Sequence, residues 1–163
     1  MASAVAQGWV HQVSISRGGA PKLSVDSAIV GVEGLEGDYH NDTRNHGGPQ
    51  RAVCLFTLEM IENLAAEGNP IYPGAVGENV TLRGIPLELL TPGATLAIGD
   101  EIRLEVTSYT APCSGVAHAF STGDFTRISQ KLHPGESRVY ARILREGTIR
   151  PGDVAQVLPP DSL

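Results

Sequence analysis

The stretch EIRLEVTSY, residues 101–109, has the most regular pattern in the chain. Apolar and polar residues alternate along it, with Ile102, Leu104 and Val106 at one set of positions and Glu101, Arg103, Glu105 and Thr107 at the other. Because successive side chains of a strand point to opposite faces, this alternation predicts a strand with one face against a core. The stretch decides the fold class: we expect a mostly β protein.

Shorter stretches on both sides of this one are also rich in strand-forming residues. Further strands are expected over residues 9–16, 27–32, 50–56, 138–145 and 153–158. The 19 glycines and 11 prolines among 163 residues suit the tight turns that join short strands. Many short strands without a regular alternation of strand and helix indicate a barrel or a folded sheet.

Two short helices are expected between the strands. One spans residues 58–67, with Thr57 as its cap and Gly68 as its stop. The other carries Phe125, Ile128 and Leu132; it is capped by Thr122 or Asp124 and ended by His133-Pro134-Gly135. Because no linker-like segment divides the chain, we expect residues 1–163 to form a single domain with two or three short helices.

Composition excludes several classes of protein. Hydrophobic residues make up 41% of the chain, and 12 Lys and Arg against 18 Asp and Glu give a net charge of −6. This charge argues against nucleic acid as a general partner, and no stretch approaches the roughly 20 apolar residues of a membrane helix. The N-terminus has no secretory pattern and two cysteines make no disulfide framework, so we expect a cytoplasmic protein with free thiols.

Several common catalytic motifs are absent from the sequence. It contains no GxxxxGK[ST] loop, no GxGxxG before a helix, no GxSxG, no HExxH and no CxxC. Cys113 and His118 could supply two zinc ligands, but no second pair completes a site, so no structural zinc is expected.

The two cysteines lie in different contexts. Cys113 follows Pro112, which fixes the backbone before the thiol, and Ser114-Gly115 leaves room beside it. Reactive cysteines occupy exposed, electropositive surroundings of this kind. Cys54 lies within AVCLF, so we interpret it as a small buried hydrophobe, placed by strand alternation on the face opposite Arg51.

Three further segments carry polar residues suited to a ligand. Gly47 and Gly48 can turn backbone N–H groups toward an anion and Arg51 offers a guanidinium fork, although an ordinary hairpin loop would have the same composition. Glu78 and Asn79 could hold a polar ligand, orient a neighbouring loop or satisfy loop backbone groups. A third segment, with Arg138, Tyr140 and Arg142 on one strand face, could line a pocket or face solvent.

Together these segments resemble the MOSC domain, the C-terminal module of molybdenum-cofactor sulfurases, which also occurs as stand-alone bacterial proteins. The matching pieces, in chain order, are GLEGDYH, HGG-P-Q-RAV, PGAVGENV, VTSYTAPC and SRVYARIL followed by GTIRPGD, over about residues 34–153. The short stand-alone proteins are the most similar members. The resemblance implies a β-barrel.

The resemblance also implies roles for particular residues. Cys113 would be the signature cysteine of the family, which carries sulfur as a persulfide or ligates molybdenum. The cofactor-binding residues would be His46, Gly47, Gly48 and Arg51 of the HGG motif, Glu78 and Asn79 of the GEN motif, and Arg138 and Tyr140. Two positions depart from the family: Gln50 replaces a frequent Asp and Thr110 a frequent Arg, so Arg51 and Arg138 have more of the anion to hold.

Three functions follow as hypotheses. In the first, Cys113 receives sulfur from a PLP-dependent cysteine desulfurase and passes it to a metal–sulfur or pterin cofactor. In the second, Cys113 ligates the molybdenum of a molybdopterin enzyme that reduces N-hydroxylated compounds with electrons from a redox partner. In the third, the protein is a non-catalytic module that binds an anionic cofactor. The first two make it an enzyme. The predicted site has Cys113, Arg51 and Arg138 in one pocket, and a buried Cys113 far from both arginines would contradict it.

Overall fold

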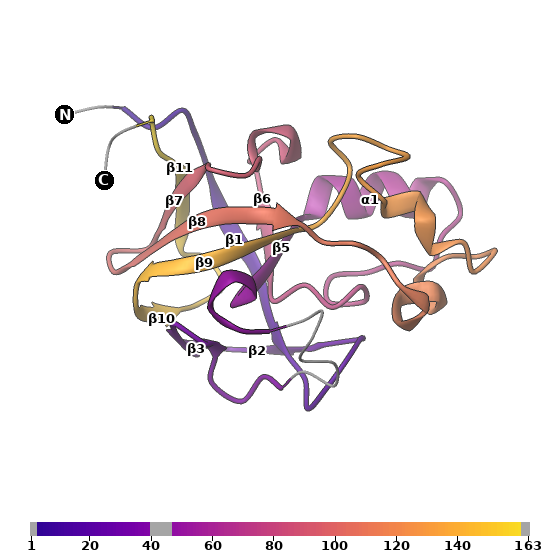
Figure 1. Ribbon diagram of the computed structural model, residues 1–163, viewed down its shortest axis with the longest axis horizontal. Helices are drawn as coiled ribbons and strands as arrows, with labels where there is room; N and C mark the ends of the chain where they lie inside the picture. Colours follow the sequence, from indigo (N-terminus) through magenta and orange to yellow (C-terminus); the bar gives the residue numbers. More distant parts are fainter. Residues whose placement is uncertain (1–2, 40–46, 161–163) are drawn as a thin grey trace.

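Seven strands close into a barrel in the computed structural model, which describes residues 3–39 and 47–160 (Figure 1). Their order around the barrel is β11-β7-β8-β9-β5-β6-β1, and β11 pairs with β1 to close it. The barrel strands are β1 (Ala6–Ile15), β5 (Val53–Thr57), β6 (Val80–Arg83), β7 (Thr95–Ile98), β8 (Ile102–Tyr109), β9 (Val139–Arg145) and β11 (Val154–Val157). The mostly β, barrel-like class predicted from the sequence is confirmed.

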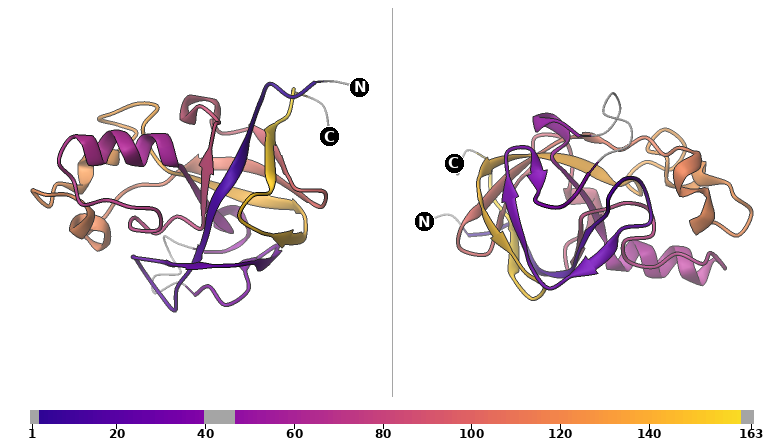
Figure 2. Two further views of the ribbon diagram at one scale, coloured as in Figure 1. Left: turned by 180° about the vertical axis from the view of Figure 1, so that it is seen from behind. Right: turned by 90° about the horizontal axis from the view of Figure 1, so that it is seen from below.

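Four short strands complete the β structure. Strand β2 (Leu23–Val25) pairs with the end of β1. A separate three-stranded sheet has the order β10-β3-β4, with bounds Gly147–Ile149, Ala28–Gly31 and Gly34–Leu35. In the view from below, this sheet and β2 lie across one end of the barrel (Figure 2).

The strand that decides the fold class forms as expected. In β8 the alternate residues Ile102, Leu104 and Val106 are each 1% exposed, whereas the residues between them are only partly buried. β8 pairs antiparallel with β7 and with β9, so its apolar face contributes to the barrel interior. A single cluster of buried hydrophobic side chains joins all the barrel strands, which makes the described residues one domain.

One parallel pair interrupts the otherwise antiparallel barrel. Strands β5 and β6 run parallel, joined by a crossover that contains helix α1 (Leu58–Ala66). The Thr57 side chain accepts a hydrogen bond from the Met60 backbone N–H, as predicted for the helix cap. The sequence pattern shows no strand–helix alternation, because only one crossover of this type is present.

The second predicted helix is shorter than expected. Asp124 accepts a hydrogen bond from the Thr126 N–H and caps a 3-10 helix, Phe125–Ile128, that stops before Leu132. Leu132 is 58% exposed, so no continuous apolar face extends the turn into a helix. Pro134 disfavours helical backbone at the residue before it. The other 3-10 helices are Pro49–Arg51, Leu87–Leu89 and Ser114–Ala119.

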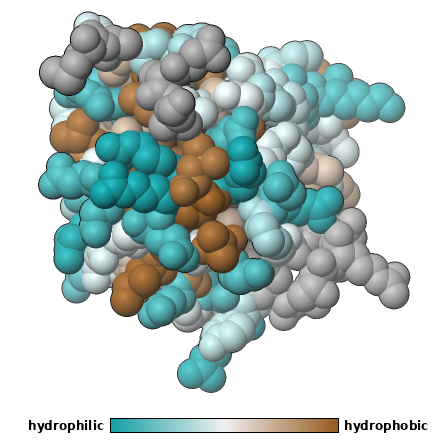
Figure 3. Space-filling view, turned by 60° about the vertical axis from the view of Figure 1, so that its left-hand side comes forward, coloured by the Kyte–Doolittle hydropathy of each residue, from teal (hydrophilic) through white to brown (hydrophobic). Residues whose placement is uncertain are grey.

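On the face shown in Figure 3, hydrophobic side chains form a short stripe bordered by polar ones. Within the described residues, no helix is both long enough and apolar enough to cross a membrane.

Candidate functional site

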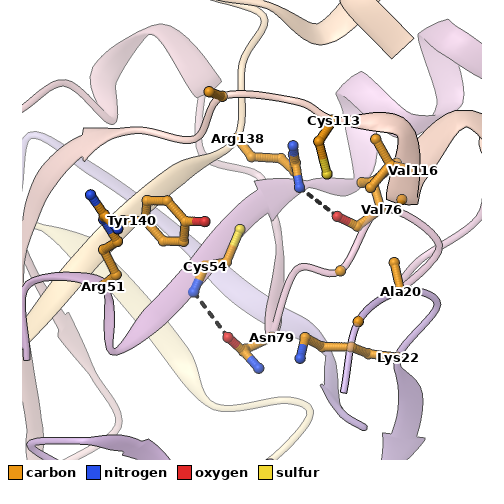
Figure 4. A pocket seen from close by; sticks show the side chains of 14 residues that line it. Ala20, Lys22, Arg51, Cys54, Val76, Asn79, Cys113, Val116, Arg138 and Tyr140 are labelled. Carbon is orange, nitrogen blue, oxygen red and sulfur yellow. Dashed lines mark hydrogen bonds between the residues drawn. The ribbon is translucent and has the colours of Figure 1, made fainter. Parts of the chain in front are cut away.

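A pocket of about 240 Å³ lies where five parts of the chain meet (Figure 4). Residues from β5, β9 and the loops next to β1, β6 and β8 line it: Gly19, Ala20, Lys22, Arg51, Cys54, Val76, Gly77, Asn79, Ala111, Cys113, Gly115, Val116, Arg138 and Tyr140. The fold thus brings Cys113, Arg51 and Arg138 to one pocket, as the predicted site requires. The lining holds three cationic side chains and, among the described residues, no Asp or Glu.

Cys113 occupies the loop that leaves β8. Its thiol is free and the residue is exposed at the pocket. A Cβ atom at Gly115 would lie 3.5 Å from Cys113 Sγ, so glycine keeps that side of the sulfur open. The Cys113 carbonyl accepts a hydrogen bond from the Val116 N–H, which ties the loop to the 3-10 helix that follows. The local structure therefore presents the thiol to the cavity, with small neighbours.

Arg138 reaches the pocket from the segment just before β9. It is only 4% exposed, and its Nη1 donates a 2.6 Å hydrogen bond to the Val76 carbonyl. Its Nε has no hydrogen-bond partner among the described residues. Buried donors in folded proteins are nearly always paired, so this guanidinium is an exception that calls for an explanation.

Arg51 and Tyr140 contact each other at another side of the pocket. The Arg51 guanidinium carbon is 5.9 Å from the centre of the Tyr140 ring, a distance typical of a cation–π contact. Burial raises the pKa of Tyr140, with the Cys54 thiol as a further cause, so the phenol keeps its proton. In Figure 4 the Tyr140 hydroxyl points toward Cys54 and Arg138.

The burial predicted for Cys54 is confirmed, but its predicted placement on the face opposite Arg51 is wrong. Its side chain lines the same pocket as Cys113. Strand alternation relative to Arg51 does not apply, because Arg51 belongs to a 3-10 helix and β5 begins only at Val53. Burial raises the pKa of the Cys54 thiol, and its sulfur lies 3.7 Å from Thr110 Oγ1.

Lys22 is the pocket residue that the sequence interpretation missed. Its Nζ lies 2.7 Å from Asp38 Oδ1, and the two side chains are only 6% and 2% exposed. No recognised pattern includes Lys22, and it comes near the other lining residues only through the fold. Its partner Asp38 belongs to the GLEGDYH motif, but the sequence does not show which cation that acid meets.

The GEN motif supports the pocket through hydrogen bonds. Asn79 Oδ1 accepts from the Cys54 N–H, while its Nδ2 donates to Ser14 O and to Asp38 Oδ2. Asn79 lines the pocket, yet its amide is occupied by these three partners. They correspond to the loop-orienting role considered for it from the sequence.

Glu78 lies behind the pocket rather than in its lining. The side chain is fully buried, and Thr81 Oγ1 donates a 3.2 Å hydrogen bond to its Oε2. Its Oε1 has no partner in the described part of the chain. Burial raises the pKa of Glu78 to about 7, against the lowering effect of hydrogen bonds and of the Arg138 charge.

The remaining predicted residues are not brought to the pocket. Gly47 and Gly48 have φ angles of 81° and 82° but are absent from the lining. His46 lies outside the described residues. Arg142, on the predicted cationic strand face, pairs with Glu105 at 2.6 Å instead. His118 Nε2 lies 2.8 Å from the Ala75 carbonyl oxygen, and no group of three or more metal-ligating side chains occurs in residues 3–39 and 47–160.

Comparison with known proteins agrees with this architecture. The sequence profile of the MOSC domain matches residues 42–156, and the chain belongs to the MOSC domain family. Association with the molybdenum cofactor is a property of that family as a whole.

Three curated relatives match parts of the chain. YflK of Bacillus subtilis is 32% identical over 129 residues, a protein of Gibberella moniliformis named "Reductase" is 29% identical over 129, and YiiM of Escherichia coli is 28% identical over 114. These matches cover 77%, 77% and 67% of the chain. The chain spans only 56% of YflK, 22% of the reductase and 50% of YiiM.

Solved structures share the fold. The YUAD protein of Bacillus subtilis superimposes with a TM-score of 0.77 at 18% identity, covering 96% of this chain and 98% of that one. YiiM of Geobacillus stearothermophilus has a TM-score of 0.70 at 23% identity, covering 93% of this chain and 75% of that one.

Proposed function

We propose that this protein is a molybdenum-cofactor-associated sulfur carrier of the cytoplasm, in which Cys113 holds the sulfur as a persulfide. The observation that carries the proposal is the exposed Cys113 thiol in a pocket that also contains Lys22, Arg51 and Arg138. A thiolate is the nucleophile in sulfur exchange, and neighbouring cations stabilise its negative charge.

Loading of Cys113 needs a persulfide donor, for which a PLP-dependent cysteine desulfurase is the expected partner. The Cys113 thiolate attacks the terminal sulfur of the donor persulfide, the donor S–S bond breaks, and the donor cysteine leaves as a thiolate. Atoms and electrons balance without an additional oxidant. The resulting persulfide on Cys113 is anionic, and Arg138 and Arg51 line the same cavity to neutralise it.

The donor set of the pocket fits a molybdenum cofactor. Such a cofactor, when bound, supplies a metal centre with affinity for soft sulfur ligands and an anionic phosphate. Cys113 offers the soft sulfur, while the guanidinium groups of Arg51 and Arg138 offer donors for the anion. The unpaired Arg138 Nε adds buried donor capacity beside the cavity.

The test is sulfur loading measured by intact mass. The purified protein is incubated with a PLP-dependent cysteine desulfurase and cysteine, alongside the Cys113→Ser and Cys54→Ser variants. We expect the wild type and Cys54→Ser to gain one sulfur atom and Cys113→Ser to gain none. A wild-type protein that gains no sulfur refutes the carrier function.

A reductase is the second candidate, favoured by the name of the Gibberella relative, although this chain spans 22% of that protein. In this function Cys113 ligates molybdenum, and electrons for reducing N-hydroxylated compounds come from a redox partner. Protein expressed in a host that makes the cofactor would then contain molybdenum and pterin, and Cys113→Ser would lose the metal. Absence of both from carefully isolated wild-type protein contradicts this candidate.

A further inference from the structure

Glu78 and Arg138 are oppositely charged side chains buried at the pocket. They are 0% and 4% exposed, yet no hydrogen bond or ion pair joins one to the other. Each also keeps one polar atom, Glu78 Oε1 and Arg138 Nε, that has no hydrogen-bond partner among the described residues. Lys22 and Asp38, by contrast, are in direct contact at 2.7 Å. Because buried charges are normally paired, the charge of Arg138 is only partly compensated by the described chain.

Arg138 connects the buried acid to the cavity. It lines the cavity, whereas Glu78 is absent from the lining although its two neighbours in the chain belong to it. Arg138 Nη1 donates to the Val76 carbonyl, two residues before Glu78, and the Arg138 charge lowers the pKa of Glu78. In Figure 4 the same guanidinium lies beside the Cys113 side chain. One cation therefore acts both on the buried acid and on the cavity that holds the exposed thiol.

The single positive charge of Arg138 has two possible negative partners. With a neutral thiol in the cavity, the guanidinium compensates ionised Glu78. A negative group on Cys113 draws on the same charge and repels a carboxylate behind it, because charges inside a protein are only weakly screened. An anion in the cavity and ionised Glu78 thus disfavour each other, and linkage makes this effect equal in both directions.

We propose that Glu78 is a positioning residue that acts through Arg138: its ionised carboxylate competes with a negative group on Cys113 for the guanidinium. The inference rests on the proposed function, since the Cys113 persulfide is the anion that this competition affects. A proton from water neutralises Glu78 when that anion forms and leaves again when the sulfur is passed on. This role differs from the cofactor contact that the family resemblance implies, because Glu78 itself does not line the cavity.

The competition takes effect near neutral pH, because burial raises the pKa of Glu78 to about 7. Below this pH the protonated acid leaves the Arg138 charge to the cavity, and above it the carboxylate offsets that charge. Cys54 of β5 and Tyr140 of β9 both have a pKa raised by burial, so they keep their protons in this range.

Two further groups border the segment that carries Glu78. Lys22 and Asp38 compensate each other in their ion pair. His118 Nε2 lies 2.8 Å from the Ala75 carbonyl oxygen, and histidine is the side chain whose charge most often changes near neutral pH. A test of Glu78 therefore needs a variant of His118 beside it.

The first experiment compares how fast Cys113 reacts with two methanethiosulfonates of opposite charge, followed by peptide mass spectrometry. The ethylsulfonate reagent is anionic and the ethyltrimethylammonium reagent is cationic. Both react with the same thiolate, so the ratio of their rates reports the local charge and not the thiolate fraction. We expect the ratio of the anionic to the cationic rate to fall at least about threefold from pH 6 to pH 8 in the wild type, because ionised Glu78 offsets the charge of Arg138.

Three variants separate the possible causes. Glu78→Gln keeps the residue neutral at every pH, so its ratio should stay high and flat. Glu62→Gln makes the same chemical change at an exposed position of α1 and should show the wild-type fall. His118→Gln removes the nearby histidine and should also show the wild-type fall.

The second experiment uses only the wild-type sequence, so it does not depend on the folding of a variant. Cys113 is capped with one reagent or the other, and the glutamate carboxyl groups are titrated by carbon-13 NMR. The carboxyl that titrates near pH 7 belongs to Glu78. Its midpoint should be higher with the sulfonate cap than with the trimethylammonium cap by at least about 0.5 pH unit, because an anion on Cys113 draws on the charge of Arg138.

Each contrary result overturns the proposal: a wild-type ratio that does not change with pH, a fall that persists in Glu78→Gln, a fall that is lost in His118→Gln or Glu62→Gln, no glutamate that titrates near pH 7, or equal midpoints under both caps. Neither experiment uses a desulfurase, so sulfur loading of Cys113 tests the proposed function separately. Loading with equal midpoints refutes only the role of Glu78, whereas unequal midpoints without loading refute only the sulfur carrier.

Discussion

Cys54 and Cys113 line the same pocket but differ in their exposure to solvent. Cys113 is exposed, while Cys54 is buried and its pKa is raised by that burial. Alkylation requires a thiolate that the reagent can reach. Burial in the barrel keeps the reagent away from Cys54 and disfavours its thiolate form.

Iodoacetamide should therefore modify Cys113 much faster than Cys54 in the native protein, by at least about tenfold. Peptide mass spectrometry after timed quenching measures both rates, and protein unfolded in urea gives the intrinsic rates for comparison. Equal native rates would mean that the Cys54 side of the pocket opens to solvent.

The second residue-scale prediction concerns the buried acid Glu78, whose pKa is raised to about 7. In the folded protein the raised pKa means that ionising Glu78 is unfavourable, so the ionised carboxylate lowers the free energy of unfolding. This cost is absent below the ordinary pKa of 4.5 and complete above about 7. The rise corresponds to roughly 3 kcal/mol at most. Glu78→Gln mimics the protonated acid and removes this cost.

We expect Glu78→Gln to exceed the wild type in free energy of unfolding increasingly from pH 5 to pH 8, by up to about 3 kcal/mol. Urea unfolding at several pH values gives the difference. Thr81→Val, which removes the hydroxyl that donates to Glu78, is the companion variant and should raise the native pKa further. A difference between Glu78→Gln and wild type that does not change with pH contradicts the prediction.

At the scale of elements, the pocket depends on how closely the loop before β6 approaches Lys22. Gly74 has a φ of 91°, and a Cβ atom there would lie 2.5 Å from the Lys22 carbonyl oxygen. Gly93 has a similar φ of 96° but open space around it. Substitution of Gly93 therefore tests backbone strain alone, whereas substitution of Gly74 adds a steric clash.

Gly93→Ala should cost about 1 kcal/mol of unfolding free energy, from the positive φ alone. Gly74→Ala should cost clearly more, by about a further 1–3 kcal/mol, since the new methyl group collides with backbone that has to shift. Urea unfolding of both variants tests this. Equal losses would show that the approach of the two loops is not tight.

The junction of β5 with α1 gives a further prediction. Thr57 closes β5 and caps α1 through its hydroxyl, so Thr57→Ala should lower the unfolding free energy by about 1–2 kcal/mol. Thr57→Ser retains the hydroxyl and should lose less. Losses of equal size in the two variants would assign the effect to the lost methyl group rather than to the cap.

A local sequence pattern predicts an element well where the element is regular and its bounds do not depend on tertiary contacts. The alternation in β8 and the Thr57 cap are signals of that kind, and Pro112 and Gly115 are local signals that mark the loop of the exposed Cys113. The predicted face of Cys54 assumed that the strand includes Arg51. Pro49–Arg51 instead forms a 3-10 turn, which an alternation pattern does not reveal. Such boundaries are set by tertiary contacts.

Lys22 is a different case, because no local pattern identifies it. Its partner Asp38 is 16 residues away in the chain, and Asn79 is 41 residues beyond Asp38. The pairing of β1 with β6 and the hydrogen bonds from Ser16 N to Asp38 and from Lys22 N to Gly74 O bring these segments together. A site assembled from long-range contacts therefore becomes visible only once the fold is known.

At the scale of the whole molecule, the pocket differs from the rest of the chain in its charge and lies away from the seam that closes the barrel. The chain carries −6, yet the pocket lining has three cations and no carboxylate among the described residues. The pocket lies beside β5 and β9, whereas the seam that closes the barrel is formed by β1 and β11, where the first and last described residues lie together (Figure 1).

This seam makes β11 necessary for the barrel although it contributes nothing to the pocket lining. It pairs with β1 through Ala6–Val157 to Trp9–Val154 and with β7 on its other edge, and Ala155 and Val157 are buried.

A chain ending at residue 153 should lose most of the roughly 5–15 kcal/mol that stabilises a typical domain, because the barrel opens and its core is exposed. A chain ending at residue 158 retains the strand and is the matched control. Urea unfolding and alkylation of Cys54 measure the effect: in the shorter chain Cys54 should react as fast as in unfolded protein, and in the longer one it should stay protected. Continued protection of Cys54 in the shorter chain would show that the six other barrel strands hold the pocket without closure.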